Sequence, residues 1–86
     1  MPEISRFCGI IIRMFPNEHP PSHFHAIYNR YDASFSIETF QVIKGSLPPR
    51  ILGLVVEWAQ IHKKELQKNW DLLAAKKEFH EIKPLV

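Results

Sequence analysis

The first half of the chain is a series of short apolar runs of the kind that form strands. Residues 7–15 (FCGIIIRMF) are mainly apolar on both alternating faces, which is typical of a central strand that is covered on both sides. Residues 23–28 (HFHAIY) and 31–37 (YDASFSI) predict two more strands, and Asn29-Arg30 between them has the length of a tight hairpin turn. A short fourth strand is expected at residues 41–44.

The second half has the periodicity of one long amphipathic helix. The segment 46–49 (SLPP) favours a helix start, because serine caps helices and proline is tolerated in the first turn. The pattern predicts a helix from about Pro49 to about Lys76, after which residues 78–86 either add a short final strand or pack across the sheet. The apolar stripe of this helix consists of Ile51, Val55, Trp58, His62, Leu66, Trp70 and Leu73.

Together these elements predict an α+β fold. A short antiparallel sheet of three to four N-terminal strands, within about residues 7–44, is packed by one long C-terminal helix at about residues 49–76. The 86 residues are enough for one domain, spanning residues 1–86, and not for two. With 45% hydrophobic and 12% aromatic residues, the composition is that of a globular domain and excludes a disordered chain.

Charge and cysteine content limit the partners and the compartment. The net charge of +2 permits contact with nucleic acid but lacks the concentration of basic residues that dedicated binders carry. Cys8 is the only cysteine, so it forms no intrachain disulfide, and we expect a small buried side chain in a reducing compartment. The sequence shows no signal peptide and no apolar run long enough to cross a bilayer, which favours a cytoplasmic protein without a membrane partner.

The densest group of chemically active residues is the histidine cluster within residues 19–25 (HPPSHFH). His23 and His25 are two positions apart in a predicted strand, so their side chains should project from the same face. The preceding loop, residues 16–22, contains three prolines and is therefore stiff. His19 in that loop would fold back toward the other two imidazoles.

Three converging imidazoles favour either of two chemistries, and a structural role is the alternative. Neutral histidines bind zinc and other transition metals, and imidazoles also act as general base and acid because they titrate near neutrality. Arg13 would then supply a cation for a developing negative charge. Against a metal site, no second cysteine provides a thiolate and Glu18 is the only nearby carboxylate. In the structural alternative the histidines only hydrogen-bond the neighbouring loop.

The sequence also lacks the signatures of several other functions. It contains no glycine-rich phosphate loop, no G-x-S-x-G elbow, no CxxC pair and no helix-turn-helix pattern. We therefore expect no nucleotide or other organic cofactor, and only a metal ion at the histidines is left open.

Two segments carry a resemblance to a known family: residues 2–28 (PEISRFCGIIIRMFPNEHPPSHFHAIY) and residues 37–70 (IETFQVIKGSLPPRILGLVVEWAQIHKKELQKNW). They resemble the bacterial domain-of-unknown-function 4160 (DUF4160) family, and the likeness covers almost the whole chain. Its most specific parts are the segment 19–25, the helix entry at 45–48, Glu57-Trp58 and Trp70.

The resemblance implies a genetic arrangement and a kind of partner, but not a catalytic activity. Members of the family lack an established activity, and they are often encoded beside another small uncharacterised protein, in an arrangement similar to a toxin–antitoxin pair. We therefore expect a small protein partner encoded nearby, with RNA as a candidate target and a homo-oligomer as a candidate assembly.

Two functions from different classes are consistent with these observations. In the first, the chain is the toxin-like member of such a pair and acts on RNA. His23 and His25 would serve as base and acid, with Arg13 as the cation, and His19 would support them. In the alternative, the chain is a non-enzymatic protein-binding or regulatory module, in a homodimer or a small-partner complex. Its contacts would come from an exposed strand edge and the region of Trp70.

Overall fold

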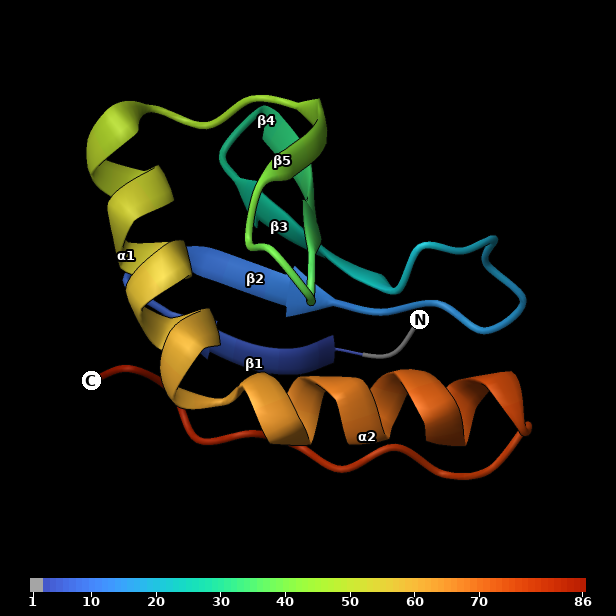
Figure 1. Ribbon diagram of the computed structural model, residues 1–86. Coiled ribbons are helices and arrows are strands. Elements are labelled where there is room, and N and C mark those ends of the chain that lie inside the picture. The colour runs from blue at the N-terminus through green and yellow to red at the C-terminus, as the bar shows by residue number, and fades with distance from the viewer. Residues whose placement is uncertain (1–2) are drawn as a thin grey trace.

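The computed structural model describes residues 3–86 and shows one antiparallel sheet followed by two helices (Figure 1). The five strands are hydrogen-bonded in chain order, so each strand lies beside its neighbour in the sequence. The expected α+β class is confirmed, with more strands and more helices than the sequence indicated. The elements are β1 (Glu3–Phe7), β2 (Ile10–Arg13), β3 (His23–Tyr28), β4 (Tyr31–Ser36), β5 (Val42–Gly45), α1 (Pro49–Ile61) and α2 (Lys63–Ala74).

The single strand predicted at residues 7–15 is wrong, because the chain forms a hairpin there. The chain reverses at Cys8 and Gly9, which have φ angles of 51° and 75°, and β1 pairs with β2 across this turn. Two successive residues with positive φ match the twist of a hairpin, and glycine adopts such angles without strain. Cys8 is exposed at the turn and is not the buried side chain that we expected.

The next strands agree closely with the sequence prediction. β3 begins and ends at the expected residues, and β4 ends one residue earlier than expected. The turn between them contains Asn29 with a φ of 52°, as the prediction of a tight hairpin requires. β5 is shifted by one residue from the expected range and is the last strand of the sheet.

The predicted single helix at residues 49–76 is wrong, because the helix breaks at His62. This residue has a φ of −111° and a ψ of 25°, outside the helical range, and α1 and α2 run in different directions on either side of it (Figure 1). A straight helix over that range would be roughly 42 Å long. The longest extent of the molecule is only 34 Å, so the break keeps both halves on the core. Neither helix of residues 3–86 has the length and apolar character needed to cross a membrane.

The core lies between the helices and one face of the sheet. Trp58 is fully buried there, with its ring 5.4 Å from that of Phe7 and 6.0 Å from that of Phe24. His62, which the sequence places on the same apolar stripe, lies instead at the helix junction, with Nδ1 2.6 Å from Glu65 Oε1. The stripe is therefore apolar in both helices and polar at the break between them.

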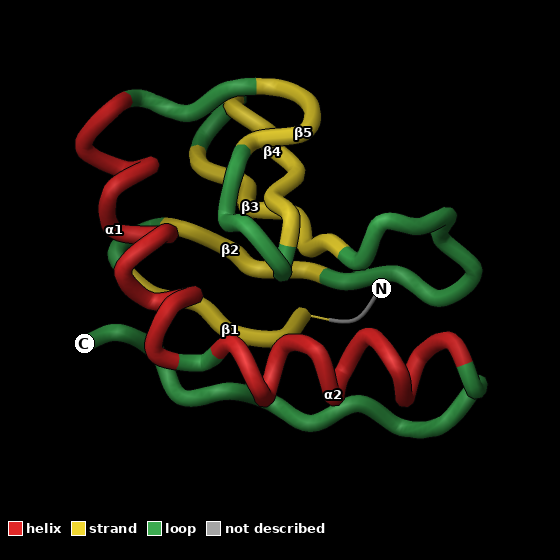
Figure 2. The backbone as a smooth tube through the Cα atoms, in the orientation of Figure 1, coloured by secondary structure: helices red, strands yellow, loops and turns green. Residues whose placement is uncertain are grey.

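Residues 75–86 form an irregular segment that runs back along α2 and beside β1 (Figure 2). The Ile82 amide donates a hydrogen bond to the Ile4 carbonyl at 2.9 Å. The Asn69 side chain bonds both backbone groups of His80. Of the two outcomes expected for this segment, it packs against the sheet, at the β1 edge, and forms no regular strand within the described chain.

The face of the sheet opposite the core carries a row of polar side chains from neighbouring strands. Arg13 in β2 is the register partner of His25 in β3. Ser34 in β4 pairs with His25 on its other side, and Lys44 in β5 pairs with Ser34. Directly paired residues of antiparallel strands project from the same face. Because Phe24, next to His25, is fully buried in the core, this row faces away from it.

Candidate functional site

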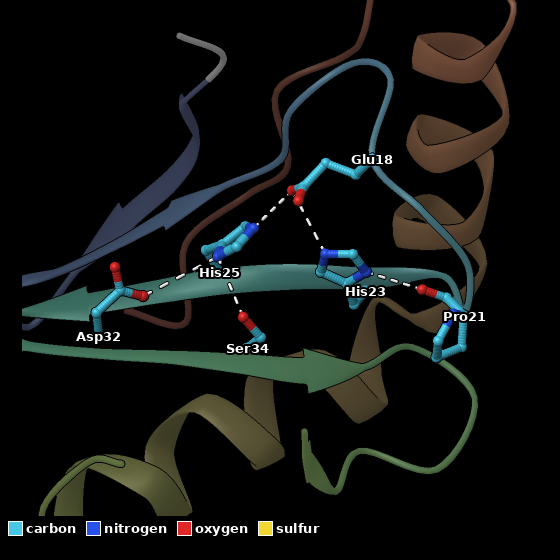
Figure 3. A network of polar contacts seen from close by, with 6 residues as sticks. All are labelled: Glu18, Pro21, His23, His25, Asp32 and Ser34. Carbon is cyan, nitrogen blue, oxygen red and sulfur yellow. Dashed lines mark hydrogen bonds and ion pairs between the residues drawn. The ribbon is translucent and has the colours of Figure 1, made fainter. Parts of the chain in front are cut away.

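Three side chains from one loop and one strand converge above β3 (Figure 3). Glu18 Oε1 lies 2.6 Å from His25 Nε2 and 3.4 Å from His23 Nε2. One potential metal-ligand atom of each residue lies within 4.8 Å of those of the other two. We call Glu18, His23 and His25 the Glu-His-His cluster.

The local sequence explains why these side chains converge. β3 places His23 and His25 on one face, as the two-residue period of a strand predicts. Phe24 between them is fully buried, which anchors β3 and fixes the direction of both imidazoles. Glu18 comes from the proline-rich loop of residues 16–22, whose rings restrict the backbone that carries it.

The orientation of His23 is set by the loop backbone. Its Nδ1 lies 2.8 Å from the Pro21 carbonyl oxygen, and a carbonyl oxygen can only accept, so Nδ1 carries the hydrogen and donates it. In the neutral ring, Nε2 then carries the lone pair, and this atom faces Glu18. The Trp70 ring of α2 packs against the imidazole, with the ring centroids 5.1 Å apart.

His25 has partners at both ring nitrogens. Nδ1 lies 3.2 Å from Ser34 Oγ and 4.0 Å from Asp32 Oδ1, while Nε2 contacts the Glu18 carboxylate. The Phe15 ring meets the imidazole edge-on at 4.9 Å. A bare nitrogen lone pair and a carboxylate oxygen repel each other at 2.6 Å, so at this distance a proton has to lie between Nε2 and Glu18.

The pKa of Glu18 is lowered overall by its two histidine neighbours. Partial burial alone raises the pKa of this carboxyl, because burial penalises the charged form. The hydrogen bond from His25, together with the positive charges of His25 and His23, lowers the pKa by more than burial raises it. Glu18 is therefore a carboxylate at neutral pH, and it attracts any cation that enters the cluster.

The cluster opens into a recess of about 280 Å³, which we call the histidine recess. This volume is enough for a phosphate or ribose group, but it is at the low end for sites that enclose a cofactor. A second hollow of about 290 Å³ reaches Glu18 as well and includes Trp70 in its lining. The polar lining of the histidine recess consists of Glu18, His19, His23, His25, Ser34 and Lys44.

Two of the four residues that the sequence predicts for the site lie together in the cluster, namely His23 and His25. His19 is exposed and lines the recess but is not one of the three residues of the cluster, and Glu18 occupies the place expected for a third imidazole. Arg13 is the cross-strand partner of His25, yet among residues 3–86 it does not contribute to the recess lining.

From the sequence alone, Ser34 and Lys44 have no assigned role, and Glu18 is only a carboxylate near the histidines. Strand pairing is the signal that identifies Ser34, because a hairpin that turns at Asn29-Arg30 pairs His25 with Ser34. To identify Lys44 as a recess residue, one would need to know how β4 pairs with β5. That pairing includes a register shift that the sequence does not reveal. No local pattern encodes the path by which the loop brings Glu18 to the histidines.

Comparison with known families gives one match. The family model described as "Domain of unknown function (DUF4160)" matches residues 9–71, which run from the β1–β2 turn into α2 and contain the whole Glu-His-His cluster. Comparisons with curated proteins and with solved structures find no match. Since the matched region is well over half of the sequence, the chain belongs to the DUF4160 family.

Proposed function

We propose that this chain cleaves RNA by acid–base catalysis in the histidine recess, as the toxin-like member of a bacterial toxin–antitoxin-type gene pair. The observation that carries this proposal is the Glu-His-His cluster, in which two imidazoles and a carboxylate meet in the lining of an open recess. The gene pair, and with it a small partner protein, is inferred from the family resemblance.

The two imidazoles suit opposite roles. Because Nδ1 of His23 donates to the Pro21 carbonyl, Nε2 of the neutral ring carries the lone pair that accepts a proton from a ribose 2′-hydroxyl. The 2′-oxygen attacks the adjacent phosphorus, so that an O2′–P bond forms while the P–O5′ bond breaks. His25, whose Nε2 is hydrogen-bonded to the Glu18 carboxylate, gives its Nε2 proton to the leaving 5′-oxygen. The products are a 2′,3′-cyclic phosphate and a 5′-hydroxyl.

Positive charge for the phosphate comes from neighbouring strands. Lys44 lines the recess, and Arg13 lies beside His25 in the strand register. A cation close to the phosphoryl oxygens stabilises the charge that develops in the transition state. We assign this role to Lys44, and we assign contact with a flanking phosphate to Arg13.

The proposal is tested by incubating the purified protein with a short fluorescent single-stranded RNA in buffer containing EDTA. Wild-type protein should produce 2′,3′-cyclic phosphate ends, detected by mass spectrometry. His23→Ala and His25→Ala should each lower the rate about 10²- to 10⁴-fold, the usual contribution of a general acid or base. His80→Ala is the matched control, because it removes an exposed histidine outside the recess and should leave the rate unchanged.

Three results would count against cleavage by these residues. The first is the absence of any product with wild-type protein. The second is equal cleavage of a matched DNA strand, which lacks the 2′-hydroxyl that the mechanism requires. The third is growth inhibition on expression that survives the combined replacement of His23 and His25 by alanine.

The second candidate function, a non-enzymatic binding module, is favoured by the free edge of β5. This strand is the last of the sheet, and all four of its residues are exposed, including Val42 and Ile43. The opposite edge, at β1, already receives a hydrogen bond from Ile82. A free edge with apolar side chains pairs readily with another strand, and a second copy of this chain would present its own β5 by twofold symmetry.

The binding module makes a different prediction about assembly. If β5 pairs between two copies, wild-type protein should be a dimer in size-exclusion chromatography with light scattering, and Val42→Lys should convert it into a monomer. His23→Ala should leave the dimer intact. A wild-type protein that is monomeric at every concentration would remove the homodimer as the assembly formed through β5.

A further inference from the structure

Three potential ligand atoms of the Glu-His-His cluster lie within 4.8 Å of one another, which is close enough for one metal ion to bind all three after a small adjustment. Zinc binds imidazole nitrogen and carboxylate oxygen at about 2.0–2.2 Å, so neighbouring ligands of a tetrahedral ion lie roughly 3.3 Å apart. The 3.4 Å between Glu18 Oε1 and His23 Nε2 fits this spacing. The 2.6 Å between Glu18 Oε1 and His25 Nε2 is a hydrogen-bond distance, and it would have to lengthen by roughly 0.7 Å. The partly exposed Glu18 side chain has room for such a shift.

The outer nitrogens of both imidazoles are held in the manner of metal-bound histidines. A histidine that binds a metal through one nitrogen usually donates the hydrogen of the other nitrogen to an oxygen atom, which fixes the tautomer and the ring direction. His23 Nδ1 donates to the Pro21 carbonyl at 2.8 Å, and His25 Nδ1 lies 3.2 Å from Ser34 Oγ, which can accept. Both Nε2 atoms are thereby directed at Glu18.

In this arrangement the negative charge of Glu18 faces the nitrogen lone pairs of the two imidazoles. With each Nδ1 carrying a hydrogen, the neutral rings turn two nitrogen lone pairs toward the Glu18 carboxylate. One proton on His25 Nε2 relieves the contact at 2.6 Å but does nothing for the lone pair of His23. A divalent cation bound at the centre of the cluster satisfies all three atoms at once.

From this geometry we infer that the Glu-His-His cluster binds a divalent transition-metal ion of the zinc class. The ligands are Glu18 Oε1 and the Nε2 atoms of His23 and His25. Two imidazoles and one carboxylate suit zinc and its neighbours better than magnesium or calcium, which prefer oxygen ligands alone. Three protein ligands leave a position for water, on the side of the cluster that opens into the histidine recess.

The inferred metal site uses the same residues as the proposed RNA cleavage, but the protein could bind the metal without having that activity. A metal ion that occupies both Nε2 atoms removes the lone pair of the proposed base and displaces the proton of the proposed acid. Zinc should therefore inhibit metal-free cleavage, which makes the metal a regulator of the recess. Zinc binding is measurable on the protein alone, so the failure of one proposal is distinguishable from the failure of the other.

The test uses protein purified without a histidine tag, stripped with EDTA and dialysed free of it. Titration with zinc chloride in a calorimeter should show one ion per chain, and cobalt chloride should give visible absorption bands in the same stoichiometry. Glu18→Gln and His25→Ala should each weaken zinc binding at least 10-fold. Ser34→Ala, which removes only the outer hydrogen bond of His25, should weaken it about 10-fold. His80→Ala is the matched control and should bind as wild type does.

The His19→Ala variant tests whether the third ligand is Glu18 or His19. Because the inferred site does not use His19, this variant should bind zinc as wild type does. Circular dichroism of each variant checks that the fold is intact. In addition, zinc should raise the melting temperature of wild-type protein and of His80→Ala but not that of His25→Ala. The inference is overturned if wild-type protein binds no stoichiometric zinc. It is equally overturned if folded Glu18→Gln and His25→Ala bind as tightly as wild type.

Discussion

Glu18 is the residue on which both proposed uses of the recess depend, since its carboxylate faces the two imidazoles at once. Burial and charge act on this carboxyl in opposite directions. Partial burial raises its pKa, whereas the hydrogen bond from His25 and the charges of both histidines lower it by more. A carboxyl whose pKa is lower in the folded than in the unfolded chain stabilises the fold while it is ionised.

Acidification should therefore destabilise wild-type protein more than Glu18→Gln, when both are free of metal. The stabilisation from Glu18 is fully present above the ordinary pKa of 4.5 and is lost as the pH falls through the lower folded-state pKa. Urea denaturation, followed by tryptophan fluorescence between about pH 6 and about pH 3, measures the free energy of unfolding over this window.

A second carboxyl provides the control for this measurement. Glu57 is exposed on α1, away from the cluster, and Glu57→Gln should lose stability with falling pH as wild type does. If the free energy of unfolding falls with pH in the same way for wild type and for Glu18→Gln, the contacts of the Glu18 carboxylate with the histidines do not stabilise the fold.

At the scale of single residues, the sequence predicts only those side-chain positions that follow from the geometry of a strand. The shared face of His23 and His25 follows from the two-residue period and is confirmed by their convergence on one carboxylate. The contribution of Glu18 depends on how a loop crosses the sheet, and loops have no periodicity from which a path can be inferred. His19 is one residue closer to the two histidines in sequence, but it is Glu18 that meets them.

At the scale of elements, turns and breaks were harder to predict than the strands themselves. The sequence predicts β3 to the residue, whereas the apolar run of residues 7–15 conceals a turn at Cys8-Gly9. The glycine was the available signal, because a two-residue turn with positive φ favours it. The helix break at His62 has no such signal, since a helical stripe of apolar residues continues on both sides.

Glycine has opposite effects in β5 and in α1, and this gives a paired prediction. Gly45 has a φ of 80°, and a Cβ atom there would overlap the Asp32 carbonyl oxygen of the neighbouring strand. Gly45→Ala should lower the free energy of unfolding by more than about 1–2 kcal/mol, the cost of the backbone conformation alone. Gly53 in α1 is exposed with open space around it, so Gly53→Ala should raise stability by about 0.5–1 kcal/mol.

Urea denaturation of the two glycine variants measures both effects under one set of conditions. The pair distinguishes a local requirement for glycine from a general sensitivity to added side-chain volume. Equal destabilisation by both changes would indicate a general sensitivity to added side-chain volume and not a local requirement for glycine at position 45. Because Lys44 precedes Gly45 in β5, the Gly45 variant should also disturb the histidine recess.

At the scale of the whole molecule, size decides features that no local pattern contains. A straight helix over the predicted range would be roughly 42 Å long, which exceeds the 34 Å longest extent of the fold in which the apolar stripe is divided between α1 and α2. The C-terminal segment shows the same limit of prediction. It docks beside β1 through irregular backbone contacts, which leave no alternation or helical spacing in the sequence.

Asn69 is the residue that fastens this C-terminal segment to α2, and its removal should release the segment. The side chain is almost fully buried, with Nδ2 donating to the His80 carbonyl at 2.7 Å and Oδ1 accepting from the His80 amide at 2.8 Å. Asn69→Ala should lower the free energy of unfolding by about 1–3 kcal/mol, the loss of two hydrogen bonds in a partly buried setting. Lys68→Ala, an exposed neighbour on the same helix, should change it little.

Hydrogen exchange shows whether that loss is local. The Ile82 amide is protected by its bond to the Ile4 carbonyl, and this bond forms only while the segment is docked. In Asn69→Ala the Ile82 amide should exchange faster than amides of β3, because the segment opens without global unfolding. Equal acceleration at Ile82 and in β3 would mean that the segment and the sheet unfold as one unit. The C-terminal segment that covers the β1 edge would then be an integral part of the core, and not a separate segment that Asn69 holds in place.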